Sequence, residues 1–249
     1  MTRPAPPTTP GVGDASWFPV FLDLCHRPVL VVGGGTVAEA KVHQLLDAHA
    51  EVTVVAPTLG DRLTEWHAGG LLRWLPRRFR PDDVAGAFIV VAATDLTAVN
   101  REVWTAAEAR SIPVNAADDP EHCSFILPAT HRQGDLTVAI STAGKAPALA
   151  VRLRNRLAEE LDAAHGPYVA LLGTFRDEIK RRFATFEERR RVWYRIVDDP
   201  LPLDLVRHGA LDAAAETVRR IIDADQPAAG SHSFVPVRLE DALAAEARR

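Results

Sequence analysis

An apolar strand that runs directly into three glycines constrains the fold of this chain more than any other feature. Residues 29–32 are apolar and mostly β-branched, and Gly33, Gly34 and Gly35 follow at once. Together with Ala38, the first and third glycines fill the G-x-G-x-x-G/A pattern of a dinucleotide-binding βαβ unit. Glycines let the backbone turn sharply and approach a pyrophosphate, whose negative charge faces the free N–H groups at a helix start. Any tight turn can use glycines, so the surrounding sequence has to show whether these belong to a dinucleotide-binding unit.

The surrounding sequence alternates between apolar strands and helices. Further strands are expected at 51–57, 71–75, 87–93 and 112–117, and helices at 36–50, 59–66 and after Asp95. The run at 87–93 is apolar throughout, which is typical of a strand buried on both faces of a parallel sheet. This alternation predicts an α/β fold with a Rossmann-like, doubly wound parallel sheet.

The pattern changes after about residue 120. Strand-like runs at 125–129 and 136–141 flank a polar turn, which predicts an antiparallel hairpin. Helices are expected at 147–161, 168–183, 186–197 and 210–223, with a break at 165–167. We therefore expect a disordered tail at 1–16, a nucleotide domain at 17–120, a hairpin segment at 121–146, a helical domain at 147–224, and a linker and tail at 225–249.

Composition argues against several classes of protein. The chain has 249 residues, of which 25% are charged, and a formal net charge of −4. This balance gives no reason to expect nucleic acid or a membrane as the main partner, and no apolar run approaches the ~20 residues of a membrane span. Cys25 and Cys123 form no CxxC pair, which favours a reducing compartment. Since the N-terminal tail also lacks the apolar region of a signal peptide, we expect a cytoplasmic protein.

The carboxyl ends of the predicted strands are where an open α/β sheet binds its ligands. Ala93 and Thr94 follow one strand there, and Pro57 and Thr58 follow another. Many dinucleotide enzymes carry an acid after the second strand, but this chain has no carboxylate there and no adjacent arginine for a 2′-phosphate. The sequence therefore favours NAD over NADP, with the ribose held by backbone groups and by Thr58.

Two further segments carry candidate chemistry. Asp118 ends the fifth predicted strand, where a carboxylate could act as a general base while hydride leaves to the cofactor; the alternative is a turn or cap role before Pro120. His122 and Cys123 lack further ligands at zinc-like spacing, so no metal site is expected. The segment 141–144 offers hydroxyls and N–H groups to an anionic ligand, or it simply connects the hairpin to a helix.

Arginines concentrate in the predicted helical domain, at 180–182, at 189–191 and at Arg195. Such runs are usually the solvated face of a helix. The functional alternative is an electropositive wall for a small molecule that carries many carboxylates.

Together these features resemble the precorrin-2 dehydrogenase family, the siroheme-synthase module that is also found fused to uroporphyrinogen methyltransferases. The resemblance covers about 18–200. It rests on FPVFL at 18–22, VVGGGTVAEAK at 31–41, AATD at 92–95, VNAADDP at 114–120, CSFILPA at 123–129, VAISTAGKAP at 138–147, and FAT at 183–185 with ERR at 188–190. The glycine motif is generic, whereas the Asn-x-x-Asp block followed at this distance by Ser-Thr-x-Gly-x-x-Pro is much more specific.

The resemblance implies NAD-dependent oxidation of precorrin-2 to sirohydrochlorin in siroheme biosynthesis. It also implies a homodimer whose hairpin dimerisation segments interlock to build the substrate cleft. Some relatives also insert ferrous iron, as sirohydrochlorin ferrochelatases. Asp118 matches the essential carboxylate of the family and becomes the first candidate for the catalytic group. The implied cofactor residues are Gly33, Gly34, Gly35, Thr36, Val37, Pro57, Thr58, Ala93 and Thr94, and the implied substrate residues are Asn115, Ser141, Thr142 and Gly144.

A second interpretation comes from a different class of protein. A non-catalytic, NAD-sensing regulatory Rossmann domain would share the glycine turn, but such modules generally carry an acid after the second strand and lack the block around Asp118. No methyltransferase domain follows the helices, so the substrate is expected from a separate enzyme. The segment after about residue 201 has no feature of the family.

Overall fold

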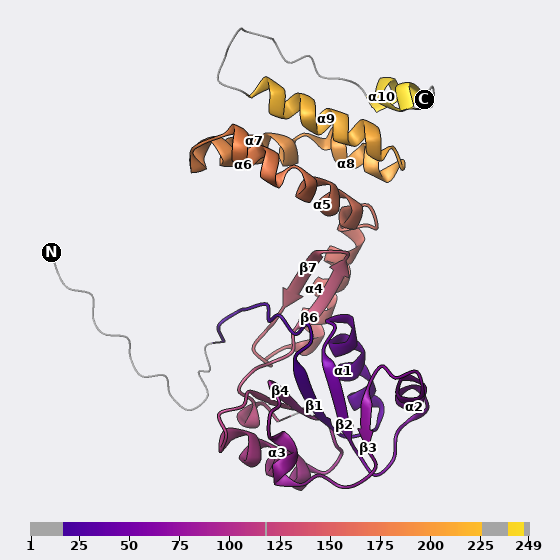
Figure 1. Cartoon of the computed structure of the whole chain (residues 1–249), viewed down its shortest axis with the longest axis vertical. Coiled ribbons are helices and arrows are strands. Elements are labelled where there is room, and N and C mark those ends of the chain that lie inside the picture. The colour runs from indigo at the N-terminus through magenta and orange to yellow at the C-terminus, as the bar shows by residue number, and fades with distance from the viewer. Residues whose placement is uncertain (1–16, 118, 226–238, 247–249) are drawn as a thin grey trace, which may run out of the picture. The chain divides into compact units, whose positions relative to one another are not determined.

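The computed structural model describes residues 17–117, 119–225 and 239–246 (Figure 1). Contacts divide the chain into two units. The first comprises Met1–Leu127 and Ser141–Ala146, and the second comprises Pro128–Ile140 and Pro147–Arg249. The tails expected at 1–16 and beyond 225 lie largely outside the described residues. Each unit is described separately below.

A parallel sheet forms the centre of the first unit. Its strands are β1 (Pro28–Val32), β2 (Glu51–Val55), β3 (Arg73–Leu75), β4 (Ile89–Ala92) and β5 (Val114–Ala116), in the order β3-β2-β1-β4-β5. Every pairing between neighbours is parallel. The predicted Rossmann-like sheet is confirmed. The strand β2 ends two residues earlier than expected, and β3, β4 and β5 begin two residues later, at Arg73, Ile89 and Val114.

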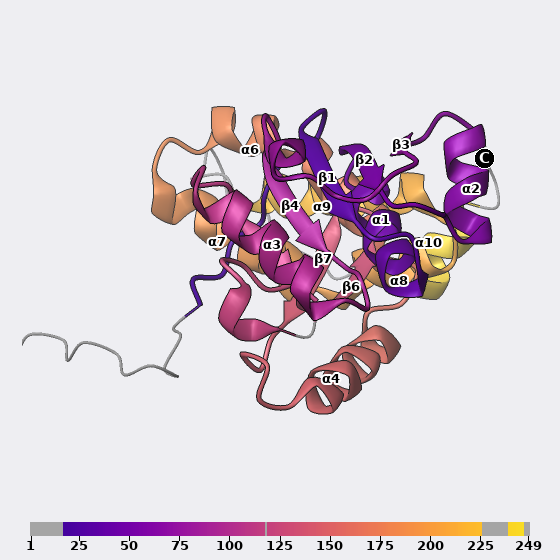
Figure 2. The ribbon, with the colours of Figure 1, turned by 90° about the horizontal axis from the view of Figure 1, so that it is seen from below.

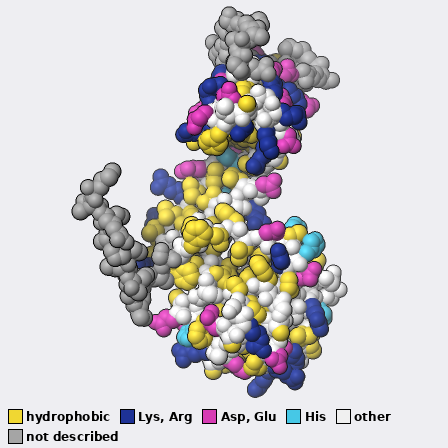
Figure 3. Space-filling model, turned by 60° about the vertical axis from the view of Figure 1, so that its left-hand side comes forward, with side chains coloured by type: hydrophobic (Ala, Val, Ile, Leu, Met, Phe, Trp, Pro, Cys, Tyr) yellow, Lys and Arg dark blue, Asp and Glu magenta, His cyan; other side chains and the backbone are white. Residues whose placement is uncertain are grey.

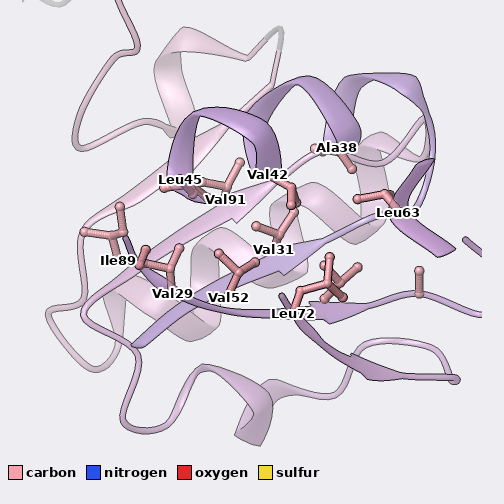
Figure 4. Close-up of a cluster of buried hydrophobic side chains, with 14 of the residues drawn as sticks. Val29, Val31, Ala38, Val42, Leu45, Val52, Leu63, Leu72, Ile89 and Val91 are labelled. Carbon is pink, nitrogen blue, oxygen red and sulfur yellow. The ribbon is translucent and has the colours of Figure 1, made fainter. Parts of the chain in front are cut away.

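Helices cover both faces of this sheet, as strands that are buried on both faces require (Figure 2). One apolar cluster joins α1 (Thr36–Asp47) and α2 (Asp61–Ala68) to alternate residues of the central strands, such as Val29, Val31 and Val91 (Figure 4). The residues between them, such as Leu30 and Val90, pack with α3 (Thr97–Glu108) and the 3-10 helix η1 (Pro81–Val84). A doubly wound core results.

The end of α1 differs from the predicted pattern. Ala38, Val42 and Leu45 lie buried on one stripe. The helix was expected to reach residue 50, but it ends at Asp47, and His49 is exposed, with φ +57°. Its N–H donates to the carbonyl of Leu46, so the residue closes the turn that leads into β2.

An ion pair fixes η1 against the segment after β3. The carboxylate of Asp83 accepts hydrogen bonds of 2.7 and 2.6 Å from the guanidinium of Arg77 and one of 2.8 Å from the N–H of Arg80. The bonds from Arg77, followed by the one from Arg80, hold the pKa of the Asp83 carboxyl below its ordinary value despite its partial burial.

Replacing Asp83 with Asn is expected to lower the free energy of unfolding at neutral pH by roughly 1 kcal/mol, because a charge-assisted pair is lost. Since the pKa of Asp83 is lowered in the folded state, its contribution is fully present above the unfolded aspartate pKa of about 3.9. It declines as the pH falls through the folded value. Urea unfolding of both proteins at neutral and acid pH measures the difference, and a gap that stayed constant would contradict the assignment.

The hairpin begins later than the sequence suggested. Its strands are β6 (Ala129–Gln133) and β7 (Leu136–Ile140), joined by a two-residue turn in which Gly134 has φ +56°. The strand expected at 125–129 was wrong. Residues 125–128 form no strand, and β6 begins only at Ala129. Just before them, Ser124 exchanges hydrogen bonds with Val114 of β5.

In the second unit, α4 (Pro147–Glu160) packs against both hairpin strands. The structure therefore groups the hairpin with the helices, whereas the sequence suggested a separate segment at 121–146. Ala150 is the residue of α4 that is buried, whereas Leu153 is 40% exposed. Nor are the two units separated by a single boundary, because Ser141–Ala146 returns to the first one.

Helices make up the rest of the second unit: α5 (His165–Thr174), α6 (Arg176–Arg182), α7 (Phe186–Asp198), α8 (Pro200–Arg207), α9 (Leu211–Ala224) and α10 (Leu239–Glu246). The residues 165–167 were expected to break a helix, but they begin α5, because proline is tolerated in a first turn. A Cβ on Gly166 would lie 3.0 Å from the carbonyl of Gln133, so the hairpin turn packs closely on α5. The short helix α8 was not predicted. Within the described residues, no helix is long and apolar enough to cross a bilayer.

Candidate dinucleotide and substrate site

The strand order defines where a ligand of the first unit would bind. From β1 the chain moves outward to β2 and β3, and then crosses to β4 and β5 on the other side. In open α/β sheets, ligands bind at this reversal, outside the carboxyl ends of the strands. Gly33 follows β1 there, and Ala93 follows β4. The glycine turn and the β4–α3 turn are therefore neighbours at the expected position.

The three glycines differ in what surrounds them. Gly33 has φ +128°, and a Cβ built on it would lie 2.2 Å from the carbonyl oxygen of Ala93. A Cβ on Gly34 would lie 2.1 Å from the carbonyl oxygen of Thr58. At Gly35, no atom lies within 4 Å of the added Cβ. The first two glycines allow turns to pack together, while the third leaves open space in front of α1.

The start of α1 fits a pyrophosphate. Gly35 is its N-cap and provides no side-chain cap, and the chain continues through Thr36 and Val37 into a helix of 12 residues. The first N–H groups of a helix have no partners within it, and the helix dipole favours negative charge at this end. The absent side chain of Gly35 leaves open space beside these N–H groups. The residues present therefore fit a dinucleotide phosphate.

The β2–α2 segment forms the adjacent wall. The N–H of Gly60 donates to the carbonyl of Gly34 (2.8 Å), and the indole N–H of Trp74 donates to the carbonyl of Ala56 (2.9 Å). These bonds hold Pro57 and Thr58 beside the glycine turn. Trp74 was not predicted to support the site; the available signal was the indole N–H, a single polar group in the middle of β3. The roles of Pro57 and Thr58 in binding the ribose stay predictions.

The proposed catalytic residue, Asp118, lies outside the described residues. Its neighbour Asp119 has defined contacts: Nδ1 of His122 lies 2.8 Å from Oδ1, and Nε of Arg101 lies 4.0 Å from Oδ2. The His122 ring also packs edge-on against Trp104 of α3, with centroids 4.7 Å apart. Asp119 therefore belongs to a cluster that anchors the segment after β5 to α3.

Asn115 was predicted to contact the substrate, and the structure shows what its side chain does within the fold. It is buried, and its amide donates to the carbonyl of Phe125 (3.0 Å) and towards the sulfur of Cys123 (3.5 Å). Burial raises the pKa of the Cys123 thiol, and the negative charge of Asp119 adds to this effect. The pair thus holds residues 123–125 on the edge of β5, and a role of Asn115 in substrate binding stays a prediction.

The segment 141–144 forms a compact turn before α4. The hydroxyl of Ser141 accepts from the N–H of Ala143 (3.0 Å), and that of Thr142 accepts from the N–H of Ala146 (3.1 Å). Ala143 and Gly144 both have positive φ, of 52° and 78°. By contact, the turn belongs to the first unit, as does the glycine turn. The assignment of Ser141, Thr142 and Gly144 to substrate binding stays a prediction.

The arginines of the helical domain are largely engaged by groups of that domain. Arg182 pairs with Glu178 and Asp223, and both Arg191 and Arg195 bind Asp225, whose side chain is only 6% exposed. Arg189 donates to the carbonyls of Phe183 and Ala184, and Arg190 lies 3.8 Å from Glu187. These contacts favour a structural role over the electropositive wall. Within the described residues, no group of three or more His, Cys, Asp and Glu could hold a metal ion.

Comparisons with known proteins agree with this arrangement. Residues 20–129 match a family described as putative NAD(P)-binding, residues 133–160 match the sirohaem biosynthesis protein central region, and residues 164–222 match the sirohaem synthase dimerisation region. A solved structure of SirC, a precorrin-2 dehydrogenase, is 32% identical and superposes with a TM-score of 0.67 over 82% of this chain and all of that chain. The chain belongs to the precorrin-2 dehydrogenase family. The family assignment and the predicted dinucleotide domain are both confirmed.

Curated relatives of this precorrin-2 dehydrogenase family member include longer proteins. Siroheme synthase 3 of Aeromonas hydrophila is 45% identical over 73% of this chain and 39% of its own length. A siroheme synthase of Thioalkalivibrio sulfidiphilus is 41% identical over 88% of this chain and 45% of its own length. The chain thus spans less than half of these two relatives.

Proposed function

We propose that the chain is an NAD-dependent precorrin-2 dehydrogenase that forms sirohydrochlorin in siroheme biosynthesis. The observation that carries the proposal is the likeness to SirC, which extends over the whole of that precorrin-2 dehydrogenase. The glycine turn and the uncapped start of α1 support the cofactor part of the proposal.

The reaction requires removal of a hydride and a proton from precorrin-2. Bound NAD supplies the hydride acceptor, so that precorrin-2 and NAD⁺ yield sirohydrochlorin, NADH and a proton. Asp118 takes the proton as the general base. The contacts of Asp119 support this choice between the adjacent carboxylates, because Asp119 already faces His122 at 2.8 Å. The glycine turn and the β4–α3 turn orient the cofactor at the edge of the sheet.

A turnover experiment distinguishes this enzyme from a non-catalytic NAD sensor. Enzymatically prepared precorrin-2 is mixed with NAD and a catalytic amount of the protein, and the absorption of the tetrapyrrole is followed. The spectrum is expected to change to that of sirohydrochlorin, and ferrous iron added afterwards tests the second activity of some relatives, insertion of iron. A protein that bound NAD but left the spectrum unchanged would be a sensor.

A homodimer is the second part of the proposal. The match to a dimerisation region at 164–222 supports it, and so do the exposed apolar side chains Leu149, Val151 and Leu153 on α4. Many other apolar side chains also reach the surface, as Figure 3 shows. Sedimentation equilibrium is expected to give twice the mass of one chain, and a monomer at micromolar concentration would contradict the proposal. The cytoplasmic location stays a prediction.

A further inference from the structure

Asn100 is a polar residue on the buried face of α3, where it is 5% exposed. Its Oδ1 accepts hydrogen bonds from the N–H (3.2 Å) and the hydroxyl (2.7 Å) of Thr94, and its Nδ2 donates to the carbonyl of Thr94 (2.9 Å). In this orientation of the amide, its oxygen and one of its two N–H groups are hydrogen-bonded to Thr94. A single side chain therefore holds both main-chain groups of one residue in the β4–α3 turn.

The turn that Asn100 holds lies against the glycine turn. The Cβ position of Gly33 is 2.2 Å from the carbonyl oxygen of Ala93 and 3.3 Å from the backbone nitrogen of Thr94. Both turns stand at the reversal of strand order, where an open α/β sheet binds its ligand. A displacement of Thr94 would therefore alter one side of the dinucleotide site.

An amide is an unusual choice for this helix position. Its neighbours on the buried face, Val103, Ala106 and Ala107, are apolar, and burial of an amide is unfavourable unless it is fully hydrogen-bonded. All three bonds go to one turn and none goes to the rest of the core. The arrangement fits a group selected to order that turn before a ligand arrives, which reduces the entropy lost on binding.

We propose that Asn100 is a positioning residue for the dinucleotide: it fixes the main chain of Ala93 and Thr94 in the conformation that binds the cofactor. This inference rests on the proposed NAD-dependent function. Asn100 itself acts through Thr94 and is assigned no step in the chemistry.

Binding of NAD to the full-length protein, measured by titration calorimetry, tests this role. Asn100→Ala is expected to weaken NAD binding roughly tenfold, because the variant loses the bonds that order Thr94 and a tenfold change in affinity corresponds to about one net hydrogen bond. At saturating NAD, kcat is expected to change little, so that the effect appears in the KM for NAD. Val103→Ala is the matched control, because Val103 is fully buried in the same helix and its side chain has no group that could hydrogen-bond to Thr94. It is expected to lower the Tm and leave NAD affinity unchanged.

Three results would overturn the role of Asn100. One is a folded Asn100→Ala protein with the affinity of the wild type, and another is equal weakening by Val103→Ala, because affinity would then follow stability alone. If Asn100→Ala does not fold, the isosteric Asn100→Asp replaces it. That variant places an oxygen next to the Thr94 carbonyl, so it is expected to weaken NAD binding. Wild-type NAD affinity of Asn100→Asp is the third result that would overturn the role. A wild-type protein that did not bind NAD would overturn the proposed function itself, a failure seen before any variant is made.

Discussion

Replacing Asp118 with Asn is expected to reduce NADH formation from precorrin-2 by a factor of about 100 or more, the usual contribution of a general base. The amide has nearly the same size but cannot accept the proton that leaves with the hydride. NAD binding is expected to remain unchanged, because the proposed cofactor site is the glycine turn. Initial rates with saturating NAD, together with NAD titration of the variant, measure both effects.

Asp119→Asn is the matched control for this prediction. Asp119 contacts His122 and Arg101, so its replacement is expected to weaken the anchoring of the segment after β5. The expected result is a lower Tm with turnover within about threefold of the wild type, because no proton transfer is lost. The opposite outcome, with Asp119→Asn inactive and Asp118→Asn active, would move the catalytic role to Asp119.

Replacing Gly33 with Ala is expected to destabilise the nucleotide domain by about 3 kcal/mol or more, or to prevent folding. The φ of +128° is strained for any L side chain, and the added Cβ would overlap the carbonyl oxygen of Ala93 at 2.2 Å. Urea unfolding measures the stability, and circular dichroism shows whether the variant folds. A stable Gly33→Ala protein would show that the two turns do not pack as described.

Gly35→Ala separates folding from binding. No atom lies within 4 Å of the added Cβ, and no positive φ is involved, so stability is expected to remain close to that of the wild type. The same methyl group would enter the space in front of α1, where the pyrophosphate is expected. NAD affinity is therefore expected to fall roughly tenfold or more, since close backbone approach is lost. If Gly33→Ala and Gly35→Ala lost stability equally, the assignment of different roles to the two glycines would be wrong.

The sequence predicted the parallel sheet well because its signals are local. The β-branched run at 29–32 and the apolar run at 87–93 become central strands, buried on both faces. The glycines identified the turn at the reversal of strand order. Their separate functions depend on Ala93 and Thr58, which are distant in sequence, and only the folded contacts distinguish them.

The errors arose where tertiary contacts decide the local structure. The run at 125–129 looks like a hairpin strand, but hydrogen bonds from Ser124 to Val114 and from Asn115 to the carbonyl of Phe125 hold its start beside β5. Pro167 looks like a helix breaker and instead lies in the first turn of α5. Asn100 was not predicted to have a role. The available signal was a polar residue on the same helix face as the apolar Val103.

The most direct test of this account is the ratio of NADH to sirohydrochlorin formed in the absence of oxygen. Precorrin-2, NAD and the protein are mixed anaerobically, so that no other oxidant is present, and both products are quantified over time. Hydride transfer predicts equal amounts of the two products, and neither of them when the protein is omitted. Sirohydrochlorin formed without NADH, or a protein that binds NAD and forms neither product, would contradict the account.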